Sequence, residues 1–188
     1  MLVDMRYTEH LVLSGIVNGA FLFILYMTFH IDVFRVELIV PLVMTFYVFS
    51  ILPDIDHSKS HASGILNLFL VYLFGFSAFD FYKTFNPLDL AKIIIAIVIF
   101  IVHAKYSKNS RLHRKFPHTF TFGIVACLLL YFLANSIVVC MVGAISFFTH
   151  ILSDGYVIRA IEKDRTLWRL AGSRIAAIKN KISKRKGF

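Results

Sequence analysis

Charged residues are scarce in this sequence. They make up 16% of the 188 residues, whereas hydrophobic residues make up 58%. Soluble domains contain about 25% charged and about 45–50% apolar residues. The composition therefore excludes an ordinary soluble domain and predicts a protein with several membrane-spanning helices.

Cysteine is also scarce, and one common catalytic motif is missing. Cys127 and Cys140 are the two cysteines, and both lie in apolar stretches. They lack the close spacing of a structural zinc site, so we interpret them as small apolar side chains of a helix bundle. No G-x-S-x-G motif occurs, so serine-type hydrolysis finds no support.

Six apolar stretches approach the length of about 20 residues with which a helix crosses a membrane. Proline, asparagine and charged residues separate them. The fifth stretch is short, so five crossings remain an alternative to six. We expect an all-α, polytopic transmembrane helix bundle within residues 1–157. The expected spans lie near residues 11–29, 36–53, 64–80, 89–104, 119–134 and 136–157.

The positive charges predict the orientation of these spans. With six crossings, 17 of the 20 Lys and Arg residues fall on one side of the membrane. Positive residues near membrane helices are retained on the cytoplasmic side. We therefore expect a multi-pass protein of the cell membrane with both termini in the cytoplasm.

Residues 158–188 form a separate, basic segment. They carry ten Lys and Arg residues against Glu162 and Asp164, which is +8 of the net charge of +9. Apolar residues recur among these cations at helical spacing, as in an amphipathic helix that lies on anionic lipid headgroups. A solvated helix docked on the bundle is the alternative. Nucleic-acid binding finds no support because no nucleic-acid-reading module is present.

Four groups of histidine and aspartate fall on the predicted cytoplasmic side, although the orientation was derived from other residues. The histidines and aspartates of these groups are His10, Asp54, Asp56, His57, His113, His118, His150 and Asp154. Arg114 lies next to His113 on the same side. His30 and His103 lie elsewhere, and we interpret both as structural.

The chemistry of these groups favours a metal site. His150 and Asp154 are one helical turn apart on one helix face, as two ligands of one cation require. Pro53 favours an extended segment that places Asp54 and Asp56 on one side. Histidine and carboxylate ligands from separate elements suit Zn²⁺, Mn²⁺ or Fe²⁺, and Arg114 could hold a phosphate. Structural polar pairs at helix ends are the alternative reading of the same residues.

In order along the chain, His10, L-P-D-I-D-H at 52–57, H-R-x-x-x-H-T at 113–119 and T-H-x-x-x-D at 149–154 resemble a known family. This is the family of membrane-bound, metal-dependent hydrolases that includes the LexA-binding inner-membrane proteins of bacteria and related archaeal membrane proteins. Lys115 and Pro117 stand where that family has glycine and threonine. More remotely, the histidine and aspartate pairs are similar to those of helical zinc phospholipases C and S1/P1-type nucleases, which implies phosphoester chemistry.

Residues and resemblance together predict a metal-dependent hydrolase at the cytoplasmic membrane surface that acts on a phosphoester or lipid-linked substrate. Asp56 or His113 would be the general base and Arg114 the anion clamp. The expected cofactor is a divalent transition metal, Zn or Mn, and the expected partners are membrane lipids. A non-catalytic scaffold or metal-binding protein, whose tail docks a partner or anionic lipid, is the alternative. The expected ligands are His10, Asp54, His57, His118, His150 and Asp154.

Overall fold

The computed structural model describes residues 7–32, 35–54, 61–106, 117–155 and 157–186, and all of its elements are helical. This confirms the all-α prediction, and each of the six expected apolar stretches is a helix. The elements are α1 (Tyr7–Phe29), α2 (Val36–Ile51), the 3₁₀ turn η1 (Leu52–Asp54), α3 (His61–Thr84), α4 (Pro87–Tyr106), α5 (Phe120–Ala134), α6 (Ile137–Ser153) and α7 (Val157–Lys186).

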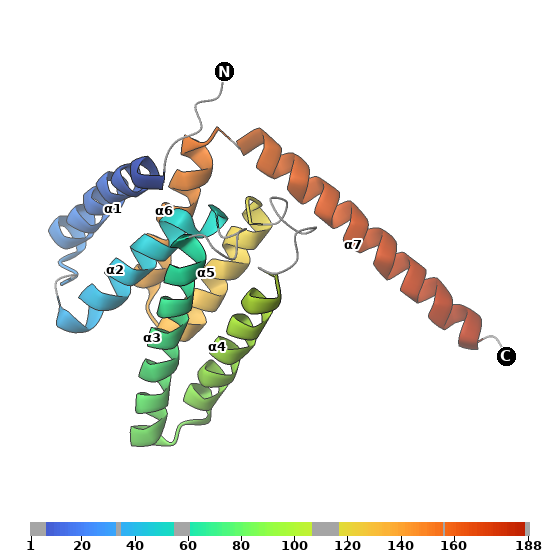
Figure 1. Ribbon diagram of the computed structural model, residues 1–188, viewed down its shortest axis with the longest axis horizontal. Helices are drawn as coiled ribbons and strands as arrows, with labels where there is room; N and C mark the ends of the chain where they lie inside the picture. The colour runs from blue at the N-terminus through green and yellow to red at the C-terminus, as the bar shows by residue number, and fades with distance from the viewer. Residues whose placement is uncertain (1–6, 33–34, 55–60, 107–116, 156, 187–188) are drawn as a thin grey trace.

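Helices α1 to α6 run alternately in opposite directions and form one bundle, from which α7 projects (Figure 1). The turn between α5 and α6 shows how the reversals are encoded. Asn135 adopts the left-handed conformation with φ 48°, and its N–H donates to the carbonyl oxygen of Tyr131. The Ser136 side chain then accepts from the N–H of Val139 and caps α6.

Within the part of the chain that the structure describes, four helices are long and apolar enough to cross a membrane: the segments Thr8–Phe29, Glu37–Asp54, Ser63–Thr84 and Pro87–Lys105. The bent pair of α6 and α7 would add a fifth. Helix α5 has 15 residues, and at about 1.5 Å per residue it is shorter than a hydrocarbon core of about 30 Å. This agrees with the expectation that the fifth stretch is short, and five crossings remain the alternative to six.

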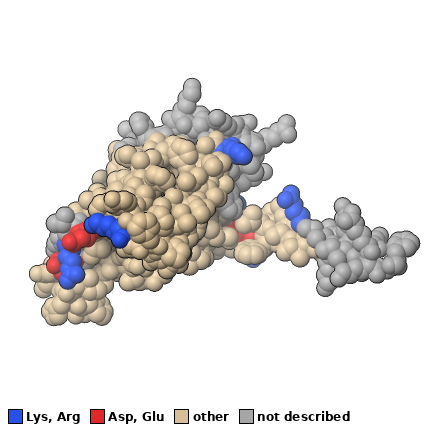
Figure 2. Space-filling model, turned by 90° about the horizontal axis from the view of Figure 1, so that it is seen from below, with Lys and Arg blue, Asp and Glu red and all other residues tan. Residues whose placement is uncertain are grey.

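The outer face of the bundle is apolar, as a lipid-facing surface requires. In Figure 2 the charged side chains lie at the margins of the bundle and along α7, and a broad uncharged surface lies between them. Val12 and Ile16 on α1 and Leu128 on α5 are each more than 60% exposed. Apolar exposure on this scale marks a protein or membrane contact surface.

Helix α6 occupies the interior, and small residues allow its neighbours to approach closely. Phe147 and Ile151 of α6 are completely buried. A Cβ atom on Gly143 would lie 2.7 Å from Leu130 of α5 and 3.2 Å from Thr45 of α2. Small residues of this kind let membrane helices pack closely. The close packing fixes the end of α6, where His150 and Asp154 lie.

Helix α7 docks on the bundle through its first turns. Ala160 is buried, and the carboxylate of Asp164 accepts hydrogen bonds from the backbone N–H groups of Phe120 (2.9 Å) and Thr121 (3.2 Å). An acidic side chain at this place satisfies the unpaired donors at the start of α5. Beyond this contact the helix extends away from the bundle (Figure 1). The Trp168 side chain in this part of the helix is exposed.

Candidate metal centre

Five of the predicted metal ligands converge at one end of the bundle. This end collects the start of α1, the end of α2 with η1, the start of α5 and the end of α6 (Figure 1). Alternating helix directions bring these four ends together. The side chains that meet there are His10, Asp54, His118, His150 and Asp154.

Asp154 lies at the middle of the cluster. One of its carboxylate oxygens is 3.0 Å from Nε2 of His10, and the other is 3.2 Å from Nε2 of His150 and 4.0 Å from Nε2 of His118. Asp54 approaches His118 and His150 at 3.7 Å each. Asp154 is buried, whereas the Asp54 side chain is 46% exposed. The cluster is therefore closed on the protein side and open at Asp54.

A backbone hydrogen bond orients the His150 ring. Its Nδ1 lies 2.6 Å from the carbonyl oxygen of Ser50, so Nδ1 carries the proton and donates it. The buried Nε2 has no hydrogen-bond partner among the described residues, although carboxylate oxygens of Asp154 and Asp54 surround it. A nitrogen lone pair that faces carboxylate oxygens is repelled by them unless a proton or a cation lies between. This is the arrangement of a metal-binding histidine, whose other nitrogen donates to a carbonyl group.

His10 is held in the same way by Ser153. The Ser153 hydroxyl donates its proton to the carbonyl oxygen of His150 at 2.9 Å, so it accepts from Nδ1 of His10 at 2.8 Å. Nε2 of His10 then presents its lone pair to Asp154 Oδ1, which is buried and makes no hydrogen bond within the described structure. Two histidines thus direct lone pairs at one carboxylate, which fits a shared cation.

The electrostatic setting favours the metal-binding forms of His118 and Asp154. Burial is the main cause that lowers the pKa of His118 to about 4, and the neighbouring His150 contributes in the same direction. Burial raises the pKa of the Asp154 carboxyl. Hydrogen bonds from His10 and His150, which require a proton on Nε2 at the place that a metal ion would otherwise take, outweigh burial and hold that pKa below its usual range. A neutral His118 and an ionised Asp154 are the forms that coordinate metals.

Two overlapping groups of these residues could hold a metal ion. One consists of His10, Asp54 and His150, and the other of His118, His150 and Asp154; within each, the ligand atoms lie within 4.8 Å of one another. Ligands about 2.0–2.2 Å from a cation lie roughly 3–4 Å from each other. His150 belongs to both groups, so one cation at the shared point or two neighbouring cations are compatible with the geometry.

The backbone at Asp54 differs from the sequence prediction. An extended segment was expected after Leu52 because proline restricts the residue before it. Instead Leu52 is right-handed helical, with φ −57° and ψ −36°, and α2 runs directly into η1. Leu52 and Pro53 are buried, so packing outweighs the local preference of the proline dipeptide. The helical turn directs Asp54 to His118 and His150.

Four of the predicted site residues lie outside the described residues. They are the expected ligand His57, the two candidate bases Asp56 and His113, and the expected anion clamp Arg114. Their roles stay predictions.

Several residues that support the cluster were not singled out from the sequence. Besides its carbonyl contact with His150, Ser50 donates its hydroxyl to the carbonyl oxygen of Phe46 at 2.7 Å and accepts from the Ser14 hydroxyl at 2.8 Å. Asn18 in turn donates to the Ser14 and Ser146 hydroxyl groups. This buried chain links α1, α2 and α6 behind the cluster. Serine within an apolar helix is common, so only contacts with the ligands distinguish these residues.

His103 shows what a structural histidine looks like in the same bundle. It is buried, and its nitrogens pair with Ser63 (3.2 Å) and with Asn67 (3.1 Å). Both ring nitrogens have neutral partners, in contrast to Nε2 of His150. This supports the structural reading of His103.

Comparison of the chain with protein-family profiles, with curated proteins and with solved structures finds no match.

Proposed function

We propose that this protein is a membrane-embedded, metal-dependent hydrolase that acts on a phosphoester or lipid-linked ester. The observation that carries the proposal is the buried Nε2 of His150, which faces Asp54 and Asp154 while Nδ1 is held by Ser50. A purely structural histidine would have both nitrogens satisfied, as His103 does. The absence of a thiolate from the cluster favours Zn²⁺ or Mn²⁺ with nitrogen and oxygen ligands.

The residues of the centre divide into holding and reacting roles. A divalent cation at this position lowers the pKa of a water ligand and polarises a phosphoryl or acyl oxygen. His10 and His150 are fixed by Ser153 and Ser50 and therefore serve as rigid ligands. Asp54 faces the open side, where a substrate enters. Asp56 or His113 as general base, His57 as a further ligand and Arg114 as anion clamp complete the proposal.

The proposed setting is the cytoplasmic surface of the cell membrane. The bias of Lys and Arg supports a multi-pass topology with both termini in the cytoplasm. The cluster then lies where helices leave the bilayer, next to lipid headgroups. The basic residues of α7, with the exposed apolar side chains of Trp168, Leu170 and Ile175, suit a contact with anionic lipid.

A non-catalytic scaffold is the second candidate. It is favoured by the long helix α7, which projects from the bundle and could meet a partner or a lipid surface there (Figure 1). In that case the metal would stabilise the bundle end and no ester would be hydrolysed.

Metal analysis and ester hydrolysis test the proposal together. We expect the purified protein to carry Zn or Mn in near-stoichiometric amount by mass spectrometry, and His150→Ala or Asp154→Ala to lose most of it. The matched control is His103→Ala, which also removes a buried histidine and should keep the metal. Circular dichroism establishes that each variant is folded. A folded wild-type protein that is free of metal and resists reloading with Zn²⁺ and Mn²⁺ would contradict the proposal.

An assay of ester hydrolysis distinguishes the proposed enzyme from the proposed scaffold. Metal-loaded wild type should cleave a phosphoester or acyl ester in detergent, and chelation should abolish the activity reversibly. Stoichiometric metal without hydrolysis of either ester class would favour the scaffold.

A further inference from the structure

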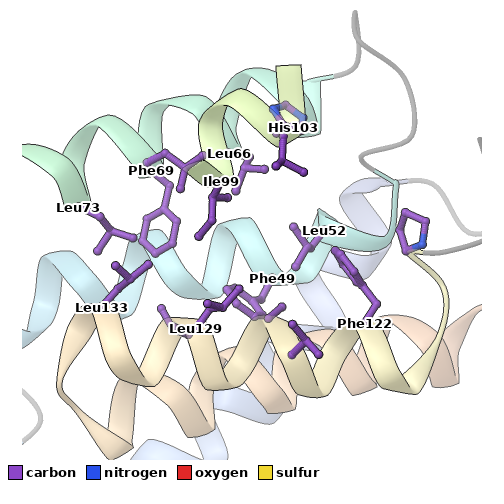
Figure 3. A pocket seen from close by; sticks show the side chains of 16 residues that line it. Phe49, Leu52, Leu66, Phe69, Leu73, Ile99, His103, Phe122, Leu129 and Leu133 are labelled. Atoms are coloured by element: carbon purple, nitrogen blue, oxygen red, sulfur yellow. The ribbon is translucent and has the colours of Figure 1, made fainter. Parts of the chain in front are cut away.

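An apolar cavity of about 210 Å³ lies between α2, α3, α4 and α5 (Figure 3). Among the described residues that line it, His103 is the one polar side chain, and the others include Phe49, Leu66 and Leu129. An apolar cavity of about 150 Å³ stays dry and can bind benzene. The larger cavity here is therefore suited to hydrocarbon rather than water.

The single polar residue does not alter this character. Asn67 Oδ1 is an acceptor, so Nδ1 of His103 donates to it, and Nε2 accepts from the Ser63 hydroxyl. Both nitrogens are thus used within the protein and offer no hydrogen bond to a ligand. The cavity can select a ligand by shape and hydrophobicity alone.

The cavity is elongated, and one of its ends adjoins the candidate metal centre. Leu73 and Leu133 lie at one end, whereas Leu52 and Phe122 lie at the other (Figure 3). Leu52 shares the turn η1 with Asp54, and the lining residue Pro117 immediately precedes His118. From Phe122 to Leu133 the lining follows α5 for about 16 Å, at about 1.5 Å per residue.

The side of the cavity opens toward the apolar outer surface. Val102 of α4 and Val125 of α5 both line the cavity, yet they are 59% and 46% exposed. The cavity therefore reaches the surface between these two helices, which contact each other little. A hydrocarbon chain can enter there from the bilayer without crossing water.

We propose that this cavity binds one hydrocarbon chain of an amphiphilic ester whose polar group lies at the candidate metal centre. The proposal rests on the proposed hydrolase function for the polar half and names the substrate class as amphiphilic esters that carry a hydrocarbon chain. An amphiphile of this kind matches both parts at once, because the apolar cavity and the polar cluster meet at Leu52–Asp54 and at Pro117 and His118.

Chain-length series test the cavity and the metal centre separately. The probes are n-alkyl phosphonates and n-alkanols from one to six carbons, titrated calorimetrically into the full-length protein in amphipol with and without Zn²⁺. Each added methylene should strengthen binding about fourfold in both series, because the cavity buries it. The phosphonates, and not the alkanols, should bind more tightly when Zn²⁺ is present.

Adjacent leucines of α5 provide the matched variants. Leu129→Trp fills the cavity and should remove the dependence on chain length while leaving methylphosphonate affinity unchanged. Leu128→Trp places the same side chain on the 64% exposed face and should behave as wild type. A dependence on chain length that is absent, or that persists in Leu129→Trp, overturns the chain site even if Zn²⁺ strengthens phosphonate binding. A dependence that Leu129→Trp removes, without any effect of Zn²⁺, supports the chain site and contradicts the metal-dependent function.

Discussion

His10 and His150 stack face to face, with ring centroids 4.0 Å apart and ring planes inclined by 16°. Two protonated rings at this distance would repel each other. Both rings also point Nε2 at Asp154. Neutral rings with a cation beside Asp154 satisfy the stacking and the lone pairs together, which is why this pair is central to the proposed function.

The first prediction concerns the hydroxyl that orients His10. Ser153→Ala removes the acceptor of Nδ1, so His10 loses its fixed orientation. Loss of such an outer contact typically weakens metal binding by about 10–100-fold. Competition titration with a chromophoric chelator measures the affinity. Ser173→Ala is the control, because Ser173 also bonds a carbonyl group three residues earlier but lies on α7 away from the cluster. Equal affinities in the two variants would contradict an orienting role of Ser153.

The second prediction concerns the contact of α7 with α5. Asp164→Ala leaves the N–H groups of Phe120 and Thr121 without their acceptor, next to the loop that holds His118. We expect a loss of about 1–2 kcal/mol in the free energy of unfolding, as for removal of a helix cap, together with weaker metal binding. Thermal unfolding by circular dichroism and chelator competition measure the two effects. Glu162→Ala removes an exposed acid from the same helix and should change neither quantity; a change as large as that of Asp164→Ala would point to net charge instead.

The sequence predicts the meeting of the ligands better than it predicts their support. Alternating spans and the positive-charge bias place His10, Asp54, His118, His150 and Asp154 on one side, and the structure brings them into contact. Only tertiary packing shows that Ser50 and Ser153 orient the rings, since serine is unremarkable in an apolar helix.

Two other features depend on packing in the same way. Asp164 belongs to a segment whose charge suggested lipid contact, yet its carboxylate caps α5. The cavity beside Leu129 lies where α4 and α5 contact each other little, and the hydropathy of each helix alone contains no information about that spacing.

The third prediction tests the close packing that fixes α6. Gly143→Ala places a methyl group 2.7 Å from Leu130 of α5. Overpacking of this kind typically costs about 1–3 kcal/mol. Gly75→Ala is the control, because a Cβ at Gly75 meets nothing within 4 Å and the change raises helix propensity alone. The difference in thermal midpoint between the two variants measures the packing effect. A Gly143→Ala protein as stable as Gly75→Ala would show that α6 can shift.

The fourth prediction concerns pH and the metal-free protein. Burial lowers the pKa of His118 to about 4 from an ordinary value near 6.5. Between these values the unfolded chain binds a proton at His118 that the folded protein does not bind. Stability should therefore rise with pH across this window, by a total on the order of 1–3 kcal/mol from this group. Asp154 affects stability at lower pH than His118 does. Because the pKa of its carboxyl is lowered in the folded protein, stability falls as the pH decreases below the ordinary pKa of an aspartate.

His118→Asn isolates this contribution. The variant keeps a polar side chain but cannot titrate, so its stability should increase less than that of wild type between about pH 4 and 6.5. Thermal unfolding in chelator at several pH values measures the difference between the two proteins, from which the titration of groups that do not interact with His118 cancels. His30→Asn, which replaces an exposed histidine, should follow wild type. Parallel curves for wild type and His118→Asn would mean that His118 titrates normally in the folded protein, and the burial that makes it a neutral ligand would then be contradicted.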